Sequence, residues 1–293
     1  MKRLWVIVSL ISISKGQILI DGTKLNYVVE GNGRPCIVIG SSIYYPRTFS
    51  DKLRKHFQFS FVDMRWFAEE YSPVNLDDFT LQTISDDIER VRSELKLENV
   101  IIMGHSIHGT IALEYAKRYP KNISHIILIG SPNLYGSEES ELAVSDLWNT
   151  ASKERKELQE EKWNEVKDTL NQVTPDKSLI LSYVANGPRY WYDANYDASW
   201  LWKDMPINMD LINHVFGTLF SGYDMFESEE EISLPIFVAL GKYDYVVPYT
   251  SWEPKYENLP NLTISLFKNS GHTPQLEESA RFDEKLLEWI NNK

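Results

Sequence analysis

The sequence predicts an α/β fold, in which a doubly wound, mostly parallel β-sheet is interrupted by a helical insertion. Apolar runs alternate with segments of helical spacing from about residue 17 to 135, which is typical of right-handed βαβ crossovers. From residue 137 the pattern changes to polar, acidic helical segments and then to an aromatic-rich segment, without strands. The alternation resumes after about residue 232. These observations predict three parts: core at 1–135, helical insertion at 136–230 and core again at 231–293.

Local patterns predict the elements of the core in order. Asp21-Gly22 favours a tight two-residue turn, so we expect a hairpin at 18–31. The continuous apolar run at 35–40 (PCIVIG) is typical of a strand that is buried on both faces of a parallel sheet. The remaining expected elements are strands at 57–65, 99–103, 123–132, 234–244 and 262–269, and helices at 81–97, 107–120 and 277–292.

Composition excludes several classes of function. The chain has 30 basic and 42 acidic residues, a formal net charge of −12, which argues against nucleic acid or an anionic membrane as partner. Its single cysteine, Cys36, excludes an internal disulfide and a thiolate metal site. Neither a metal-binding His-Glu-x-x-His spacing nor a glycine-rich nucleotide loop after a strand occurs. We therefore expect a small-molecule substrate, no cofactor and no metal, and leave monomer or homodimer open.

The N-terminus allows two interpretations. Residues 1–16 (MKRLWVIVSLISISKG) contain two basic residues, about ten apolar-leaning residues and then small serines. This favours a first β-strand and a cytoplasmic protein, because the segment is short and lacks an Ala-x-Ala-like cleavage site. The alternative is a secreted protein in which residues 1–14 are a short signal peptide. The run is too short to span a bilayer.

Ser106 stands between a predicted strand and a predicted helix. It could be an ordinary helix N-cap. However, Gly104 lies two residues before it, where a side chain would collide with a tight turn, and Gly109 lies three after it, where the helix must pass close to the sheet. A strand, a sharp turn and a helix are the context of a nucleophile elbow. The elbow would aim the backbone N–H of Ile107 at the same spot as the serine hydroxyl.

A base and an acid follow two later strands. A serine hydroxyl is a weak nucleophile without a base, and the base needs an acid to orient it. Asp244 stands at the end of the expected strand at 234–244, and His272 follows the expected strand at 262–269. Sites on open α/β sheets lie at the carboxyl ends of the strands. We therefore expect Ser106, Asp244 and His272 to form a catalytic triad.

These motifs resemble the α/β-hydrolase family over nearly the whole chain, from about residue 17 to 293. The resemblance rests on GHSIHG at 104–109, LPIFVALGKYDYVVP at 234–248 and NSGHTP at 269–274. The segment FVDMRWFAEEYS at 61–72 resembles the aspartate-x-arginine-glycine segment of the family, with Trp66 in place of the glycine. The resemblance implies a sheet with a helical cap, a Ser-Asp-His triad and hydrolysis, but no particular substrate.

The oxyanion hole departs from the family pattern. The family usually has a histidine-glycine pair after its third strand, where this chain has Ile39-Gly40. By position, the backbone N–H of Ser41 or Ser42 would join that of Ile107 as the second donor. Because a backbone amide does this work, loss of the preceding histidine side chain need not remove the hole. The two serines can equally be turn formers.

A second departure is His108, which occupies a position where the elbow normally has glycine. We expect a structural, hydrogen-bonded histidine there, with a contribution to the site as the alternative. His105, next to Ser106, matches a frequent choice of the family and is expected to pack under the elbow.

The insertion is dense in aromatic residues. Most of them are expected to pack the insertion onto the core. By analogy with the family, a few should line an apolar pocket over the active site; the candidates are Tyr190, Trp191, Trp200 and Trp202. Three acidic residues nearby could receive an amino group of a substrate, as in iminopeptidase-like relatives: Asp193, Asp197 and Asp204.

The leading functional hypothesis is a carboxylesterase that cleaves small or medium esters through an acyl-enzyme on Ser106. An iminopeptidase-like aminopeptidase is the first alternative, followed by a C–C bond hydrolase or an acyltransferase with the same triad. A hydrolase-like receptor without turnover is the alternative from another class. Haloalkane- and epoxide-type chemistry is excluded because it needs aspartate at position 106.

Overall fold

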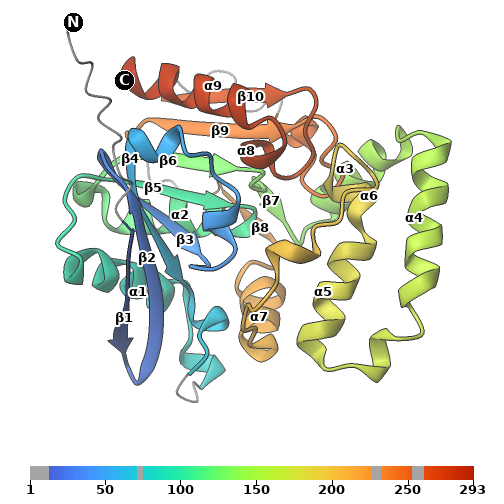
Figure 1. Ribbon diagram of the computed structural model, residues 1–293, viewed down its shortest axis with the longest axis horizontal. Coiled ribbons are helices and arrows are strands. Elements are labelled where there is room, and N and C mark those ends of the chain that lie inside the picture. Colours follow the sequence, from blue (N-terminus) through green and yellow to red (C-terminus); the bar gives the residue numbers. More distant parts are fainter. Residues whose placement is uncertain (1–12, 71–74, 226, 228–231, 253–260) are drawn as a thin grey trace, which may run out of the picture.

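The computed structural model describes residues 13–70, 75–225, 227, 232–252 and 261–293. Its main feature is an eight-stranded sheet flanked by helices (Figure 1). The strand order is β1-β2-β4-β3-β5-β6-β9-β10. In that order the strands are Ile13–Ile20, Thr23–Gly31, Phe57–Asp63, Arg34–Gly40, Val100–His105, Ile123–Ile129, Ile236–Gly241 and Leu262–Phe267.

The predicted hairpin is formed by β1 and β2, which pair antiparallel from Ile13 opposite Glu30 to Ile20 opposite Thr23. Asp21 and Gly22 both have positive φ, 47° and 80°, as a tight hairpin turn of the primed type requires. Residues 1–12 lie outside the described part of the chain, so the choice between a strand and a signal peptide at 1–14 concerns mostly residues that the structure does not describe.

The centre of the sheet is parallel and buried, as the apolar runs predict. β3 pairs parallel with β4 and β5, and β6 pairs parallel with β5 and β9. Every residue of β3 from Cys36 to Gly40 is buried, and burial raises the pKa of the Cys36 thiol. Parallel strands place all their carboxyl ends at one edge, so loops from distant parts of the chain meet there.

Helices cover the sheet at the predicted positions. α1 (Leu81–Glu94) begins with a capping box at Thr80 and packs on α2 (Ile107–Arg118), which packs on β5 and β6. α2 ends before Pro120. α8 (Pro274–Glu277) and α9 (Ser279–Asn291) close the chain, and both contact β9. No helix in these described segments is long and apolar enough to cross a membrane.

The insertion consists of α3 (Glu138–Asn149), α4 (Lys153–Val166), α5 (Pro175–Ala185), α6 (Gly187–Tyr190) and α7 (Met209–His214). A five-residue π-helical turn, Val215–Leu219, continues α7. Two short strands, β7 (Leu134–Tyr135) and β8 (Tyr223–Asp224), pair antiparallel where the insertion begins and near where it ends. α5 lies nearer to the sheet and α4 beyond it (Figure 1). The boundaries at 136 and 230 stay a prediction.

Candidate functional site

Ser106 occupies a strained turn between β5 and α2. Its backbone has φ 56° and ψ −136°, while the next residue, Ile107, is already helical. A non-glycine residue with such angles is held there by its surroundings. A Cβ on Gly104 would lie 2.1 Å from the carbonyl oxygen of His108, and one on Gly109 would lie 1.8 Å from Ser131 Oγ. The two glycines therefore permit the turn, as the sequence predicts.

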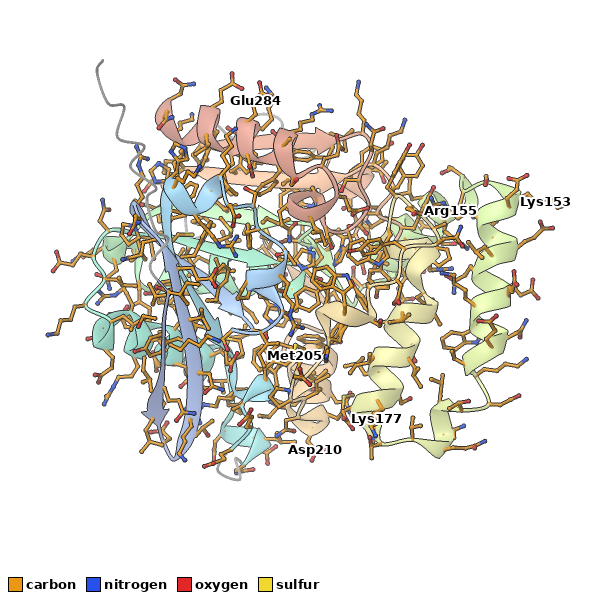
Figure 2. The ribbon with its side chains drawn as sticks, viewed as in Figure 1. Lys153, Arg155, Lys177, Met205, Asp210 and Glu284 are labelled. Atoms are coloured by element: carbon orange, nitrogen blue, oxygen red, sulfur yellow. The ribbon has the colours of Figure 1, made fainter. Side chains whose placement is uncertain are left out.

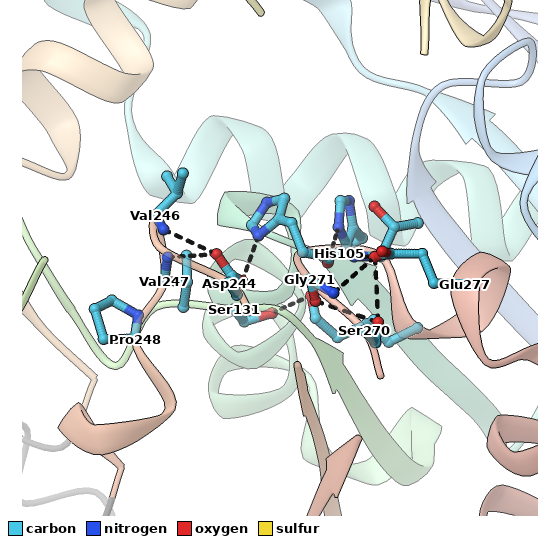
Figure 3. A network of polar contacts seen from close by, with 12 residues as sticks. His105, Ser131, Asp244, Val246, Val247, Pro248, Ser270, Gly271 and Glu277 are labelled. Atoms are coloured by element: carbon cyan, nitrogen blue, oxygen red, sulfur yellow. Dashed lines mark hydrogen bonds and ion pairs between the residues drawn. The ribbon is translucent and has the colours of Figure 1, made fainter. Parts of the chain in front are cut away.

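Asp244 and His272 lie in contact, although 28 residues separate them. His272 Nδ1 is 2.7 Å from Asp244 Oδ2, and both side chains are buried. The other carboxylate oxygen, Oδ1, accepts from the backbone N–H groups of Val246 and Val247 at 3.0 and 2.8 Å. Figure 3 shows this carboxylate between the two amides and the imidazole. These three contacts fix the orientation of the acid and of the ring.

The elbow and the histidine loop are joined by His105, the residue before Ser106. Its Nε2 is 2.9 Å from the carbonyl oxygen of His272, and the two rings lie 4.6 Å apart between centroids. Burial lowers the pKa of His105 well below its ordinary value, so its ring is neutral at pH 7. A Cβ on Gly130, which follows β6, would lie 2.6 Å from the same carbonyl. The elbow that carries Ser106 thus packs directly against the loop that carries His272.

In the turn after β3, the backbone N–H groups of the two serines predicted for the oxyanion hole differ in whether they already have a hydrogen-bond partner. The N–H of Ser42 donates to Asp63 Oδ1 at 2.5 Å, so this amide is already used. Ser41 Oγ accepts from the N–H groups of Ile43 and Tyr44, both at 3.1 Å, as a turn former does. Within the described residues, the N–H of Ser41 is the one that remains free in this turn. That of Ile107, the first in α2, has no partner within the helix.

Asp63, at the end of β4, holds this turn through its hydrogen bond with the N–H of Ser42. The carboxylate is 1% exposed, and burial raises its pKa from 3.8 to about 6, against the opposing effect of the N–H of Ser42. A raised carboxyl pKa means that folding favours the protonated form. The corresponding stabilisation is fully present below pH 3.8 and is lost as the pH rises through about 6.

The variant Asp63→Asn tests this link between the protonation of Asp63 and the stability of the fold. Asparagine does not ionise. As the pH falls from 7 to 4, the free energy of unfolding of the wild type should therefore increase relative to that of the variant, by up to about 3 kcal/mol. Urea unfolding at several pH values measures the difference, with Asp146→Asn at an exposed position of α3 as control. A difference that stays constant between pH 7 and 4 would contradict the prediction.

Trp66 and His108, which stand where the family that the sequence resembles has glycine, lie against each other. The rings of His108 and Trp66 stack with centroids 5.8 Å apart and an interplanar angle of 16°. His108 Nδ1 is 2.9 Å from the hydroxyl oxygen of Tyr45. Burial lowers the pKa of His108 to about 4, so its ring is neutral at pH 7. The expected hydrogen bond of His108 is thus present, and its ring contacts the other large replacement.

A double-mutant cycle on His108→Gly and Trp66→Gly should reveal an energetic coupling between these two side chains. Each single change should destabilise the fold, the tryptophan change by about 3–5 kcal/mol because it leaves a large cavity. The double variant should lose less than the sum, by about 0.5–3 kcal/mol, because the shared contact is lost only once. Urea unfolding gives the four free energies. The pair His108→Gly with Trp163→Ala, a half-exposed position on α4, should be additive; additivity in both cycles would refute the coupling.

A cavity of about 550 Å³ opens beside Ser106. Its walls come from the elbow, the segment after β6, helix α3, the π-helical turn and the loop after β9. The lining is mostly apolar, and its charged member is Glu141 of α3. The lining residues are Ser106, Ile107, Pro132, Leu134, Tyr135, Gly136, Ser140, Glu141, Ala143, Val144, Phe216, Gly217, Ser221, Val246, Val247, Pro248 and Ser251.

The four aromatic residues predicted for the pocket do not line this cavity. Trp191 is buried against Tyr196, and Trp200 is 43% exposed. Trp202 packs edge-on against Tyr44. Only Tyr190 reaches the triad region, with its ring 5.4 Å from that of His272. Aromatic density in the sequence thus marks packing, whereas the cavity walls come from less conspicuous residues of α3 and the π-helical turn.

The three acidic residues proposed to receive an amino group also lie elsewhere. Asp193 and Asp197 are exposed and accept from the backbone N–H groups two residues ahead, of Asn195 and Ser199, as turn residues do. Asp204 is exposed with φ 63°. Glu141 was missed because α3 carries many carboxylates with no pattern to distinguish the one that faces the cavity.

Known proteins are similar to this chain in sequence and in fold. A family model described as alpha/beta hydrolase fold matches residues 31–279. The AB hydrolase superfamily protein YclE of Bacillus subtilis is 34% identical over 272 residues, 92% of this chain and 96% of that protein. A proline iminopeptidase of Clostridioides difficile is 28% identical over 73% of both chains. The structure of an esterase from Exiguobacterium antarcticum superposes with a TM-score of 0.66 at 20% identity, over 94% of this chain and 98% of that one. The chain belongs to the alpha/beta hydrolase fold family.

Proposed function

We propose that the protein is a serine hydrolase that cleaves small or medium esters through an acyl-enzyme on Ser106. The observation that carries the proposal is the combination of a strained serine at the wall of a cavity with a buried Asp244–His272 pair. Strain at a single non-glycine residue is typical of functional positions. The catalytic roles of the three residues are part of the proposal.

In the proposed reaction, His272 takes the hydroxyl proton of Ser106 as Oγ attacks the ester carbonyl. The C–O bond to the leaving alcohol then breaks, and His272 returns the proton to that alcohol. Water then attacks the carbonyl of the acyl-enzyme and gives a proton to His272. The bond between the acyl carbon and Ser106 Oγ breaks, His272 returns the proton to Oγ, and the carboxylic acid product leaves. Asp244 keeps the imidazole in the required tautomer and stabilises its charged form.

The negative charge that develops on the carbonyl oxygen needs donors. The N–H groups of Ile107 and Ser41 are the proposed pair, because each follows the end of a strand and β3 and β5 are neighbours. The bond from Ser42 to Asp63 supports this choice, since it holds the turn that presents Ser41. Loss of one oxyanion donor typically costs about 10²–10³ in kcat.

The cavity supports a substrate of modest size with apolar groups, which favours the carboxylesterase over the C–C bond hydrolase and the acyltransferase. One observation favours a second candidate, an iminopeptidase-like aminopeptidase. Glu141 lines the cavity, and a carboxylate there could bind a substrate ammonium group. The proline iminopeptidases among the relatives agree with it. The small-molecule substrate itself is unidentified.

A panel of chromogenic esters and aminoacyl amides, assayed with wild type and Ser106→Ala, tests the proposal. Turnover of esters but not of amides, abolished in the variant, is the expected result. Turnover limited to amides with a free amine would select the aminopeptidase. Labelling of Ser106 by a fluorophosphonate without turnover of any substrate would instead support a hydrolase-like receptor.

A cytoplasmic location completes the proposal. It is supported by the single cysteine, Cys36, which lies buried in β3, whereas secreted proteins often carry disulfides. Fractionation of cells that produce the full chain, followed by an ester assay of each fraction, tests it. Activity in the culture medium would favour the secreted alternative.

A further inference from the structure

A five-residue stretch of the insertion, 188–192, lies between the acid loop and the histidine loop; it is called the bridging segment below. Its backbone accepts hydrogen bonds from both loops. Tyr245, the residue after Asp244, donates its N–H to the carbonyl of Arg189 at 3.0 Å, and His272 donates its N–H to the carbonyl of Tyr190 at 2.6 Å. Neighbouring carbonyls of one segment thus hold the two loops that carry the Asp244–His272 pair.

The bridging segment packs so closely on the histidine loop that no side chain fits between them. A Cβ on Gly271 would lie 2.1 Å from the carbonyl oxygen of Tyr190. A glycine before His272 is therefore required by this contact. A shift of the bridging segment consequently moves the loop, because the gap between the two backbones has no room to absorb it.

Glu277 of α8 makes a second connection. Its Oε1 accepts from the N–H groups of Gly271 and Thr273, at 3.0 and 3.1 Å, on either side of His272. Its Oε2 accepts from the N–H of Tyr192 at 2.7 Å. Figure 3 shows this carboxylate beside Ser270 and Gly271. One carboxylate thus ties the bridging segment to the backbone that flanks the imidazole.

Arg155 of α4 also holds the bridging segment. Its Nη1 donates to the carbonyls of Pro188 and Trp191 at 2.7 and 2.8 Å, and its Nη2 donates to that of Tyr192 at 2.5 Å. The guanidinium also lies over the ring of Tyr245, 5.6 Å from the centroid. Arg155 lies between α4 and the body of the molecule (Figure 2). Arg155 contacts neither Asp244 nor His272. It contacts the bridging segment, whose backbone positions the loops that carry both residues.

We propose that Arg155 is a positioning residue for the acid–base pair, acting through the bridging segment and Glu277. The inference rests on the proposed function, because it concerns the geometry of the same triad. Arg155 sets the distance and angle between Asp244 and His272, and α4 thereby becomes part of the catalytic apparatus although it lies outside the sheet. A misplacement of about 1 Å in such a pair costs about 10²-fold in rate.

The test compares Arg155→Ala and Arg155→Lys with wild type on the best ester of the panel. Fluorophosphonate labelling to saturation counts reactive sites, so kcat is expressed per site and a loss of folded protein does not contribute. We expect Arg155→Ala to lower kcat about 10- to 100-fold with KM within about twofold. Lysine, with a single ammonium in place of the planar fork, should recover part of the rate. Added guanidinium at low millimolar concentration should also raise kcat of the alanine variant, whereas the same concentration of NaCl should not.

Arg47 provides a matched control. Its Nη1 also donates to three carbonyls of the insertion, those of Trp200, Leu201 and Lys203, at 2.9, 2.8 and 3.0 Å. Among the described residues, this stretch makes no hydrogen bond to either catalytic loop. Arg47→Ala should therefore leave kcat per site within about threefold of wild type, which separates positioning from general anchoring of the insertion.

Two results would overturn the inference: an unchanged kcat per site in Arg155→Ala, or an equal fall in Arg47→Ala. If Arg155→Ala does not fold, Arg155→Lys carries the test, and a wild-type kcat in that variant would count against a geometric role of the fork. Absence of ester turnover in the wild type itself would instead refute the proposed function.

Discussion

Replacement of Ser106 by alanine is expected to lower kcat by at least about 10⁴-fold on any substrate that the wild type turns over. The proposed mechanism requires a covalent acyl-enzyme, and among the residues that the structure describes no other serine or threonine has a positive φ like that of Ser106 at the strand-to-helix turn. Binding of the substrate should persist, because the change leaves in place the rest of the cavity lining and the backbone N–H groups proposed as oxyanion donors. Single-turnover and steady-state kinetics with a chromogenic ester measure the loss.

The control for this change is Ser145→Ala, at an exposed position of α3 outside the cavity lining. It should retain the wild-type rate within about twofold, since surface substitutions rarely change stability by more than about 0.5 kcal/mol. A rate above a tenth of that of the wild type in Ser106→Ala would refute the nucleophile assignment.

Asp244→Asn should lower kcat by about 10³–10⁴-fold while the fold stays intact. The reason lies in the two amides that face Oδ1. The N–H groups of Val246 and Val247 require an acceptor there, so the asparagine must place its NH₂ group against His272. The imidazole then accepts at Nδ1 and carries its proton on Nε2, the nitrogen that should take the proton of Ser106. The variant therefore keeps its geometry but holds the wrong tautomer.

The pH dependence of kcat for Asp244→Asn, together with its thermal unfolding midpoint, checks this account. The midpoint should stay near that of the wild type, because the backbone contacts of Oδ1 are preserved. Asp197→Asn is the matched control, since Asp197 also accepts from a backbone N–H but lies in an exposed turn. Equal activity of both variants would exclude Asp244 as the orienting acid.

The strands, the elbow and the order of the predicted triad could be read from the sequence because each depends on local chemistry. Gly104 and Gly109 lie within three residues of Ser106; the close contact of Gly104 is local, with His108, whereas that of Gly109 is with Ser131. The parallel strands then bring Asp244 and His272 to one edge, which follows from topology alone. The prediction of the hairpin at Asp21-Gly22 succeeded for the same reason: the turn chemistry is contained in two residues.

Contacts between distant residues could not be predicted in this way. Trp66 and His108 are each unusual in the sequence, but their stacking depends on how β4 and α2 approach each other. The use of the Ser42 amide by Asp63 required the three-dimensional turn. Likewise, tryptophans drew attention to the middle of the insertion, whereas Glu141 and Phe216 face the cavity. Side-chain identity indicates burial in general, and only packing shows which surface is covered.

The position of β10 in the sheet has a consequence for partial unfolding of the protein in denaturant. β10 is an edge strand, paired with β9 on one side, and five of its six residues are only half-buried. Edge elements open locally at a lower free energy than the centre of a domain. His272 lies in the loop that follows this strand, whereas Ser106 follows β5 in the centre. We therefore expect the proposed hydrolase activity to be lost in mild denaturant before most of the secondary structure is lost, because the loop that carries His272 should open with this edge strand.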